Sequence, residues 1–251
     1  AMAIGAGQKP SVISAIMKYH TTELARLIGI DAMDIHGGKA VMLGPKNYLS
    51  TAHEAAPIGI TVEGANIMTR SLIIFGQGAF RCHPFVLKEI EAANLEDETE
   101  AIEQFDVHFF NHIGYSVTNA ASAFVRGITD KFTDSPVMDE TATYYRQINR
   151  FSAAFALLTD ISMVVMGGSL KRKETISARL GDVLSSLYLA SVSLKYYEDT
   201  GDKEAELPLV HWTQKTLIAE AQEKIHQTLS NFPNKFIGIL IKLIIFPLGR
   251  N

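Results

Sequence analysis

The segment ITVEGANI places a single carboxylate, Glu63, in an apolar stretch directly before a glycine and the start of a predicted helix. Desolvation by Ile60, Val62 and Ile67 would disfavour the charged carboxylate, and a carboxyl group poised in this way can act as a general base near neutral pH. Gly64 has no Cβ, so a substrate can approach the backbone closely there. Two interpretations of the pattern stay open: a catalytic base, and a glutamate that only complements the dipole of the following helix.

Two other groups of residues have the types, but not the arrangement, that a reactive site needs. His108 and His112 are four residues apart on a predicted helix, so both could face one metal ion. No HExxH motif surrounds them, and their aromatic neighbours favour packing instead. Cys82 and His83 are adjacent, so their side chains diverge and a nucleophile–base pair is not expected. We therefore predict no metal site.

The elements that must position Glu63 are helices. Apolar residues recur at helical spacing along most of the chain. Helices are predicted at residues 11–36, 64–80, 84–94, 99–128, 138–166, 170–198 and 209–230. The clearest stripe runs from Ile176 to Tyr197, whereas residues 58–62 give the only strand-like signal and Gly59 weakens it. The predicted fold class is all-α, a bundle of long helices.

Composition excludes several classes of function. The chain has 251 residues, of which 47% are apolar and 20% charged, so it can bury a core and is neither disordered nor collagenous. A lone cysteine, Cys82, rules out an internal disulfide framework and fits a reducing compartment. The net charge of −4 gives no basic surplus, so we expect no nucleic-acid partner.

The most apolar run, FIGILIKLIIF at residues 236–246, is short and contains Lys242. No run approaches the roughly 18 apolar residues of a membrane-spanning helix. A run of this length is more often buried core, and peripheral contact with a membrane surface is the alternative.

Several motifs resemble one known family. ITVEGANIMTR resembles the part of acyl-CoA dehydrogenases that carries the catalytic glutamate, and DAMDIHGG is similar to the family's flavin-proximal motif. FGQGAFRCHPFV, GGSLKRKETISARLGDVLSSLYLASVSLKYYEDTG and ELPLVHW resemble the bacterial long-chain acyl-CoA dehydrogenases of fatty-acid β-oxidation, which have a helical C-terminal extension. The resemblance implies the C-terminal helical domain at 1–80, truncated at its start, and the extension at 81–251, truncated at its end.

The resemblance also implies a reaction and a cofactor. Glu63 would remove the α-proton of a fatty acyl-CoA while hydride passes to FAD, giving trans-2-enoyl-CoA, and electron-transferring flavoprotein would take the electrons onward. Glu63 and Gly64 would contact the substrate, whose carbonyl oxygen is bound in the family by the glutamate's own amide. Gly37 and Gly38 would approach the FAD across a dimer interface. Ala65 stands where many members have a flavin-contacting threonine.

Three departures from the family pattern limit what the chain can do alone. Ala65 cannot donate the hydrogen bond of a threonine, and Asp34 replaces a frequent glutamine near the flavin diphosphate. The family's N-terminal helical domain and middle β-domain are missing, so we expect the isolated chain to be inactive. We expect the intact protein to be a cytoplasmic homo-oligomer, with contact to the inner membrane as an alternative. A non-catalytic helical scaffold and a flavoprotein of the same fold with changed chemistry also stay open.

Overall fold

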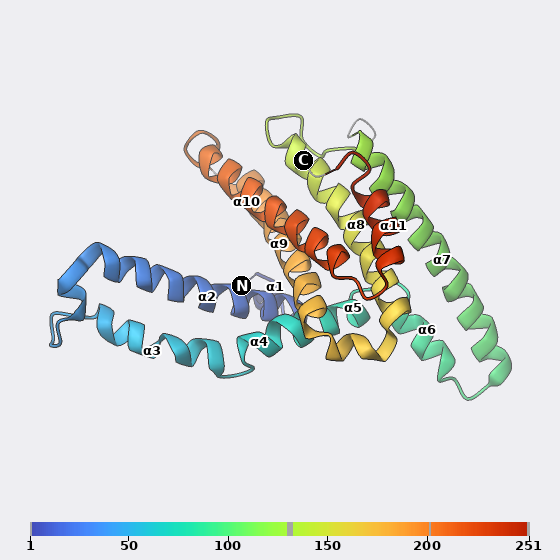
Figure 1. Ribbon diagram of the computed structural model, residues 1–251, viewed down its shortest axis with the longest axis horizontal. Helices are drawn as coiled ribbons and strands as arrows, with labels where there is room; N and C mark the ends of the chain where they lie inside the picture. The colour runs from blue at the N-terminus through green and yellow to red at the C-terminus, as the bar shows by residue number, and fades with distance from the viewer. Residues whose placement is uncertain (1, 130–132, 201, 250–251) are drawn as a thin grey trace. The chain divides into compact units, whose positions relative to one another are not determined.

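Every regular element in the described part of the chain is a helix. The computed structural model describes residues 2–129, 133–200 and 202–249 (Figure 1). The all-α prediction is therefore confirmed for these ranges. The chain divides into two compact units, Ala1–Ile74 and Phe75–Asn251.

Unit 1 is built on a helical hairpin. After the short α1 (Met2–Gly5), the long α2 (Ser11–His36) ends in η1 (Gly37–Val41), and α3 (Leu49–Thr61) runs back beside α2 (Figure 1). The chain then enters α4 (Asn66–Met68) and η2 (Thr69–Gln77). The strand-like signal at residues 58–62 was misleading, because this stretch forms the last turn of α3 and its C-cap, where packing on α2 overrides local propensity.

Only the first turns of α2 are buried. Val12, Ala15 and Ile16 lie in the interior, whereas Leu24 and Leu27 on the same predicted apolar face are 54% and 56% exposed. A two-helix hairpin covers one side of each helix and leaves the other side open. The apolar pattern of α2 is therefore only partly used within the described chain.

Unit 2 contains the remaining helices of the chain. They are α5 (Gly78–Arg81), α6 (Val86–Ala93), α7 (Glu98–Ile128), α8 (Ala142–Met166), η3 (Gly167–Arg172), α9 (Glu174–Thr200), α10 (Lys203–Ser230) and α11 (Lys235–Ile245). Side-chain caps fix three of the helix starts. Asp97, Asp202 and Asn234 each accept hydrogen bonds from backbone amides in the first turn of α7, α10 and α11.

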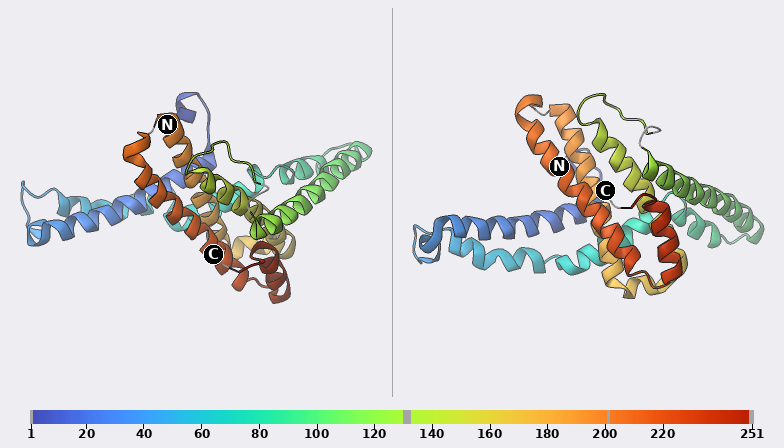
Figure 2. Two further views of the ribbon diagram at one scale, coloured as in Figure 1. Left: turned by 90° about the horizontal axis from the view of Figure 1, so that it is seen from above. Right: turned by 45° about the horizontal axis from the view of Figure 1, so that its top comes forward.

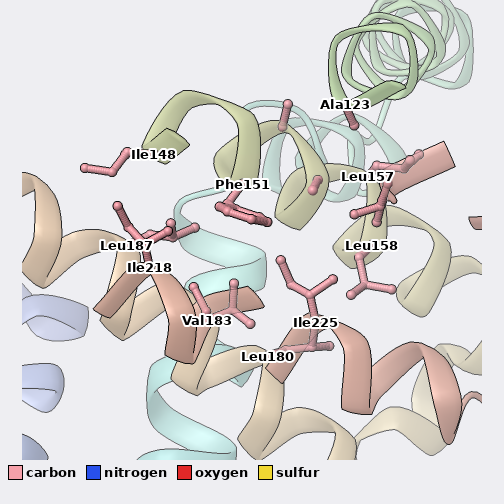
Figure 3. Packing of buried hydrophobic residues seen from close by; sticks show 14 of the residues in the cluster. Ala123, Ile148, Phe151, Leu157, Leu158, Leu180, Val183, Leu187, Ile218 and Ile225 are labelled. Atoms are coloured by element: carbon pink, nitrogen blue, oxygen red, sulfur yellow. The ribbon is translucent and has the colours of Figure 1, made fainter. Parts of the chain in front are cut away.

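Helices α8, α9 and α10 form the core of unit 2, with α9 and α10 as an antiparallel pair (Figure 2). The stripe predicted on α9 is confirmed, because Leu180, Val183 and Leu194 are completely buried. Leu180 and Val183 pack beside Leu158 of α8 and Ile225 of α10, both also 0% exposed (Figure 3). Close packing of this kind makes the three helices one cooperative unit.

Two glycines let α11 approach its neighbours closely. A Cβ at Gly238 would lie 2.8 Å from the carbonyl oxygen of Leu229, and one at Gly127 would lie 2.7 Å from Cδ of Pro247. Both distances are shorter than packed carbon atoms allow. The backbone contact therefore depends on the absence of a side chain at these positions.

The apolar run 236–246 is only partly core. Ile241 and Ile245 are 5% and 1% exposed, whereas Phe236 and Leu243 are 76% and 59% exposed. Residues 142–172 form a helical stretch long and apolar enough to cross a membrane, and 50% of its most apolar window is buried inside the protein. The pair Leu49–Thr61 and Asn66–Arg81, bent by 44°, passes the same test. The buried helices of a protein core commonly have this length and hydropathy, so these two features are only weak support for a membrane span.

Candidate functional site

Glu63 has an unusual backbone conformation. Among the residues that the structure describes, Glu63 is the one non-glycine residue with a positive φ, at +52°. Gly64, which follows it, has a φ of +90°. The left-handed region costs a residue with a side chain on the order of 1–3 kcal/mol, and such residues gather at functional sites. The conformation arises in the short link between α3, which ends at Thr61, and α4, which begins at Asn66, where the chain bends by 44°.

The turn is held in place by a lysine from α2. The ammonium group of Lys18 donates hydrogen bonds to the carbonyl oxygen of Gly64 at 2.9 Å and to Oδ1 of Asn66 at 2.6 Å. The hydroxyl of Thr69 donates to the same Gly64 oxygen at 3.2 Å. These bonds fix the peptide between Gly64 and Ala65, and the charge on Lys18 makes its bonds stronger than neutral ones.

Asn66 links this turn to α2 a second time. Its Nδ2 donates to Oγ1 of Thr22 at 2.9 Å and to Oε1 of Glu23 at 2.8 Å, and its side chain is buried. Lys18 and Thr22 are four residues apart and so lie on one face of α2. The amide of Asn66 therefore has both its oxygen and its nitrogen paired with α2.

The Glu63 side chain itself is exposed. Its apolar neighbours Val62 and Ile67 are 48% and 72% exposed, so they do not desolvate the carboxylate in the described chain. The described chain leaves the Glu63 carboxylate exposed, so the desolvation expected from its apolar neighbours is not found within it. The backbone amides of Glu63 and Gly64 donate no hydrogen bond to any described residue. Both amides remain available to an oxygen atom of a ligand.

Gly37 and Gly38 lie at the other end of the hairpin. Gly37 ends α2 with φ +56° and ψ −139°, a conformation essentially restricted to glycine. Both glycines are exposed, and a Cβ at either would meet no atom within 4 Å. At 1.5 Å per helical residue, Gly37 lies about 28 Å along α2 from Lys18, which binds the turn after Glu63. One chain therefore does not bring the glycine pair and Glu63 together.

Ala65 lies between the strained turn and the next helix. It precedes α4 with an extended ψ of 140°, and its carbonyl oxygen accepts the amide of Thr69 at 2.9 Å. Its methyl side chain has no hydrogen-bonding group, so only its backbone can contact a polar ligand.

Lys18 and Asn66 are the positioning residues that the sequence interpretation missed. The sequence shows Lys18, Thr22 and Glu23 as polar residues on one face of α2, but nothing in it connects them to Asn66. The pair His108 and His112 is not a unit in the structure, since His112 pairs with residues of other elements.

Comparison with known proteins identifies the class to which this fold belongs. Residues 1–76 match the family model for the acyl-CoA dehydrogenase C-terminal domain. Residues 80–251 match the model for the acyl-CoA dehydrogenase C-terminal region of bacterial type. The chain belongs to the acyl-CoA dehydrogenase family.

A solved structure with a similar fold is an acyl-CoA dehydrogenase from Bacillus anthracis complexed with FAD. The two share 15% sequence identity with a TM-score of 0.66 over 96% of this chain. At this identity the likeness shows the fold alone. The present chain spans 36% of the length of that protein.

Proposed function

We propose that this chain is the C-terminal part of a flavin-dependent acyl-CoA dehydrogenase that converts fatty acyl-CoA to trans-2-enoyl-CoA, with Glu63 as the base. The observation that carries the proposal is the conformation of Glu63. Hydrogen bonds from Lys18 and Thr69 hold the carbonyl of the neighbouring Gly64, and the exposed carboxylate of Glu63 is free to reach a ligand. Membership of the family supports the same reading.

The residues of this turn have complementary roles in proton removal. The Glu63 carboxylate takes the proton from the α-carbon, and the thioester oxygen then gains negative charge. The amide of Glu63 makes no other hydrogen bond to the described residues and can donate to that oxygen. Gly64 leaves space for the thioester beside the backbone. FAD, when bound, supplies the acceptor for the hydride from the β-carbon.

The geometry of α2 favours an oligomeric flavin site. Gly37 and Gly38 offer bare, exposed backbone that suits a diphosphate, and Ala65 offers backbone near the reacting end. The helix separates Gly37 from the Glu63 turn by about 28 Å, which is longer than the span from ring to diphosphate in a flavin dinucleotide. We therefore propose that the glycine pair contacts the FAD of a second subunit in a homo-oligomer.

Activity is proposed for the longer protein only. Glu63 and its apolar neighbours are exposed, so the described chain does not exclude water from the base. We propose that segments outside this chain cover the turn and complete the acyl-CoA pocket, which makes the isolated chain inactive. Electron-transferring flavoprotein is the proposed partner of the reduced enzyme in the cytoplasm.

The decisive experiment is anaerobic mixing of the full-length protein with palmitoyl-CoA while the absorbance of oxidised flavin is followed. We expect loss of that absorbance, its recovery on addition of electron-transferring flavoprotein, and no response from the 251-residue chain supplied with FAD. Bound flavin that keeps its absorbance with short and long acyl chains would indicate changed chemistry. A protein without flavin would indicate the scaffold function.

We also propose that α11 rests on a membrane surface. It exposes apolar side chains at Phe236, Ile239, Leu240 and Leu243, carries two lysines and has no acidic residue. Such a helix suits an anionic interface. The full-length protein should sediment with vesicles rich in phosphatidylglycerol, and Leu240→Glu should reduce the bound fraction severalfold. Val164→Glu, at an exposed position of α8, is the matched control, and equal binding of both variants would contradict the proposal.

A further inference from the structure

Three side chains in unit 2 bring metal-binding atoms together. One ligand atom each of His83, His112 and Asp160 lies within 4.8 Å of the other two. Nε2 of His83 is 2.9 Å and Nε2 of His112 is 3.5 Å from Oδ1 of Asp160. The His83 and Asp160 side chains are only 6% and 4% exposed, so the cluster is interior.

The surrounding groups orient these atoms toward a common point. Oε1 of Glu89 is 2.8 Å from Nδ1 of His112, and a carboxylate oxygen can only accept, so Nδ1 carries the proton. The lone pair of His112 is then at Nε2, which faces the other two residues. The hydroxyl of Ser116 donates to Oδ2 of Asp160 at 2.6 Å and leaves Oδ1 for the cluster. A carboxylate behind a histidine is the usual support of a metal ligand.

We propose that His83, His112 and Asp160 form a binding site for Zn²⁺, held between α7, α8 and the loop before α6. Two imidazoles and one carboxylate are a ligand set that zinc accepts. Bonds of about 2.0–2.1 Å in a tetrahedron require ligand atoms about 3.3 Å apart, and the distances of 2.9 and 3.5 Å lie on either side of this value. The two imidazole ligand atoms lie within 4.8 Å of each other, and side-chain rotations must bring all three separations to this value.

The charge and the space around the cluster suit a cation with an open position. The carboxyl groups of Asp160 and Glu89 both contact the His112 ring, Asp160 at 3.5 Å from Nε2 and Glu89 at 2.8 Å from Nδ1. A cavity of about 210 Å³ adjoins His83 and is lined in part by Thr159, whose buried hydroxyl has no partner among the described residues. A water molecule on the metal would fit there.

Binding of Zn²⁺ must break the hydrogen bonds that His83 makes in the metal-free protein. Nδ1 of His83 accepts the amides of Phe85 and Val86, both at 3.2 Å, so Nε2 carries the proton in the metal-free protein. Coordination through Nε2 moves that proton to Nδ1 and breaks both bonds. These amides precede or open α6, where water can take over as acceptor. Coordination also breaks the hydrogen bond from Nε2 of His83 to Asp160, so three metal–ligand bonds replace three hydrogen bonds.

The test is titration of the full-length, chelator-treated protein with Zn²⁺ by calorimetry, and with Co²⁺ by visible absorption. We expect one ion per chain. His112→Gln and Asp160→Asn should each weaken binding by about 100-fold or more, and Glu89→Gln by about 10–100-fold. His108→Gln, on the same helix and outside the cluster, is the matched control and should bind like the parent.

Circular dichroism checks that each variant keeps its helices. If Asp160→Asn does not fold, the Zn²⁺ affinity of His112→Gln alone decides the test. Absence of binding would overturn the site. Equal affinity in His112→Gln and His108→Gln would also overturn it. Metal binding and flavin reduction by acyl-CoA are measured separately. Failure of the metal site can therefore be told apart from failure of the proposed function.

Discussion

Replacing Glu63 by Gln in the full-length protein is expected to lower the rate of flavin reduction by palmitoyl-CoA by about 10²–10⁴-fold. Gln keeps the shape and the backbone amide of the residue but cannot accept the α-proton. Because the described chain places Gly37 and Gly38 far from this turn, flavin content should not change. Stopped-flow absorbance under anaerobic conditions measures the rate, and the ratio of flavin to protein measures the content.

Two further variants separate the chemistry of Glu63 from its structural role. Glu54→Gln removes an exposed carboxylate of α3 and should leave the rate unchanged. Glu63→Gly should relieve the positive φ of 52° and stabilise the protein by up to about 1 kcal/mol while abolishing turnover. A Glu63→Gln protein with the parent rate would exclude Glu63 as the base. A destabilised Glu63→Gly protein would show that the turn is not strained.

The parts of the fold that the sequence predicted are those in which local periodicity and tertiary packing agree. The stripe on α9 from Ile176 to Tyr197 is buried as expected, because each apolar position meets α8 or α10. On α2 the same periodicity failed after Ile16, since the described chain provides no layer that covers Leu24 and Leu27. Periodicity shows which face of a helix is apolar, but not whether a partner covers it.

The sequence predicted only those parts of the candidate site whose residues are neighbours in the chain. Glu63 and Gly64 are neighbours in sequence, so their types indicated a reactive turn, although the strain at Glu63 could not be foreseen from composition. The bonds from Lys18 to Gly64 and Asn66 join positions 46 and 48 residues apart. His83 and Asp160 are separated by 77 residues. Contacts of this length depend on the assembled fold, and residue spacing carries no signal for them.

A second large effect is expected from Asn66, which holds the turn after Glu63 against α2. Asn66 is 5% exposed, accepts the Lys18 ammonium at 2.6 Å and donates to Thr22 and Glu23. Truncation of Asn66 to Ala would remove the hydrogen bonds that Lys18, Thr22 and Glu23 make to its side chain in a half-buried environment. Loss of such bonds costs about 1–3 kcal/mol. The turn after Glu63 would then keep only the bond from Lys18 to the Gly64 carbonyl as its link to α2.

We therefore expect Asn66→Ala to lower the melting temperature of the full-length protein and to reduce kcat for palmitoyl-CoA by about 100-fold, since a base displaced by an ångström loses its alignment. Asn94→Ala removes an exposed asparagine whose amide bonds only within its own turn, to Ile90, and should leave kcat unchanged. Asn66→Asp keeps the acceptor for Lys18 but loses the donors, so its kcat should fall between the two. An Asn66→Ala enzyme that melts earlier but keeps its kcat would show that Asn66 stabilises the fold without aligning Glu63.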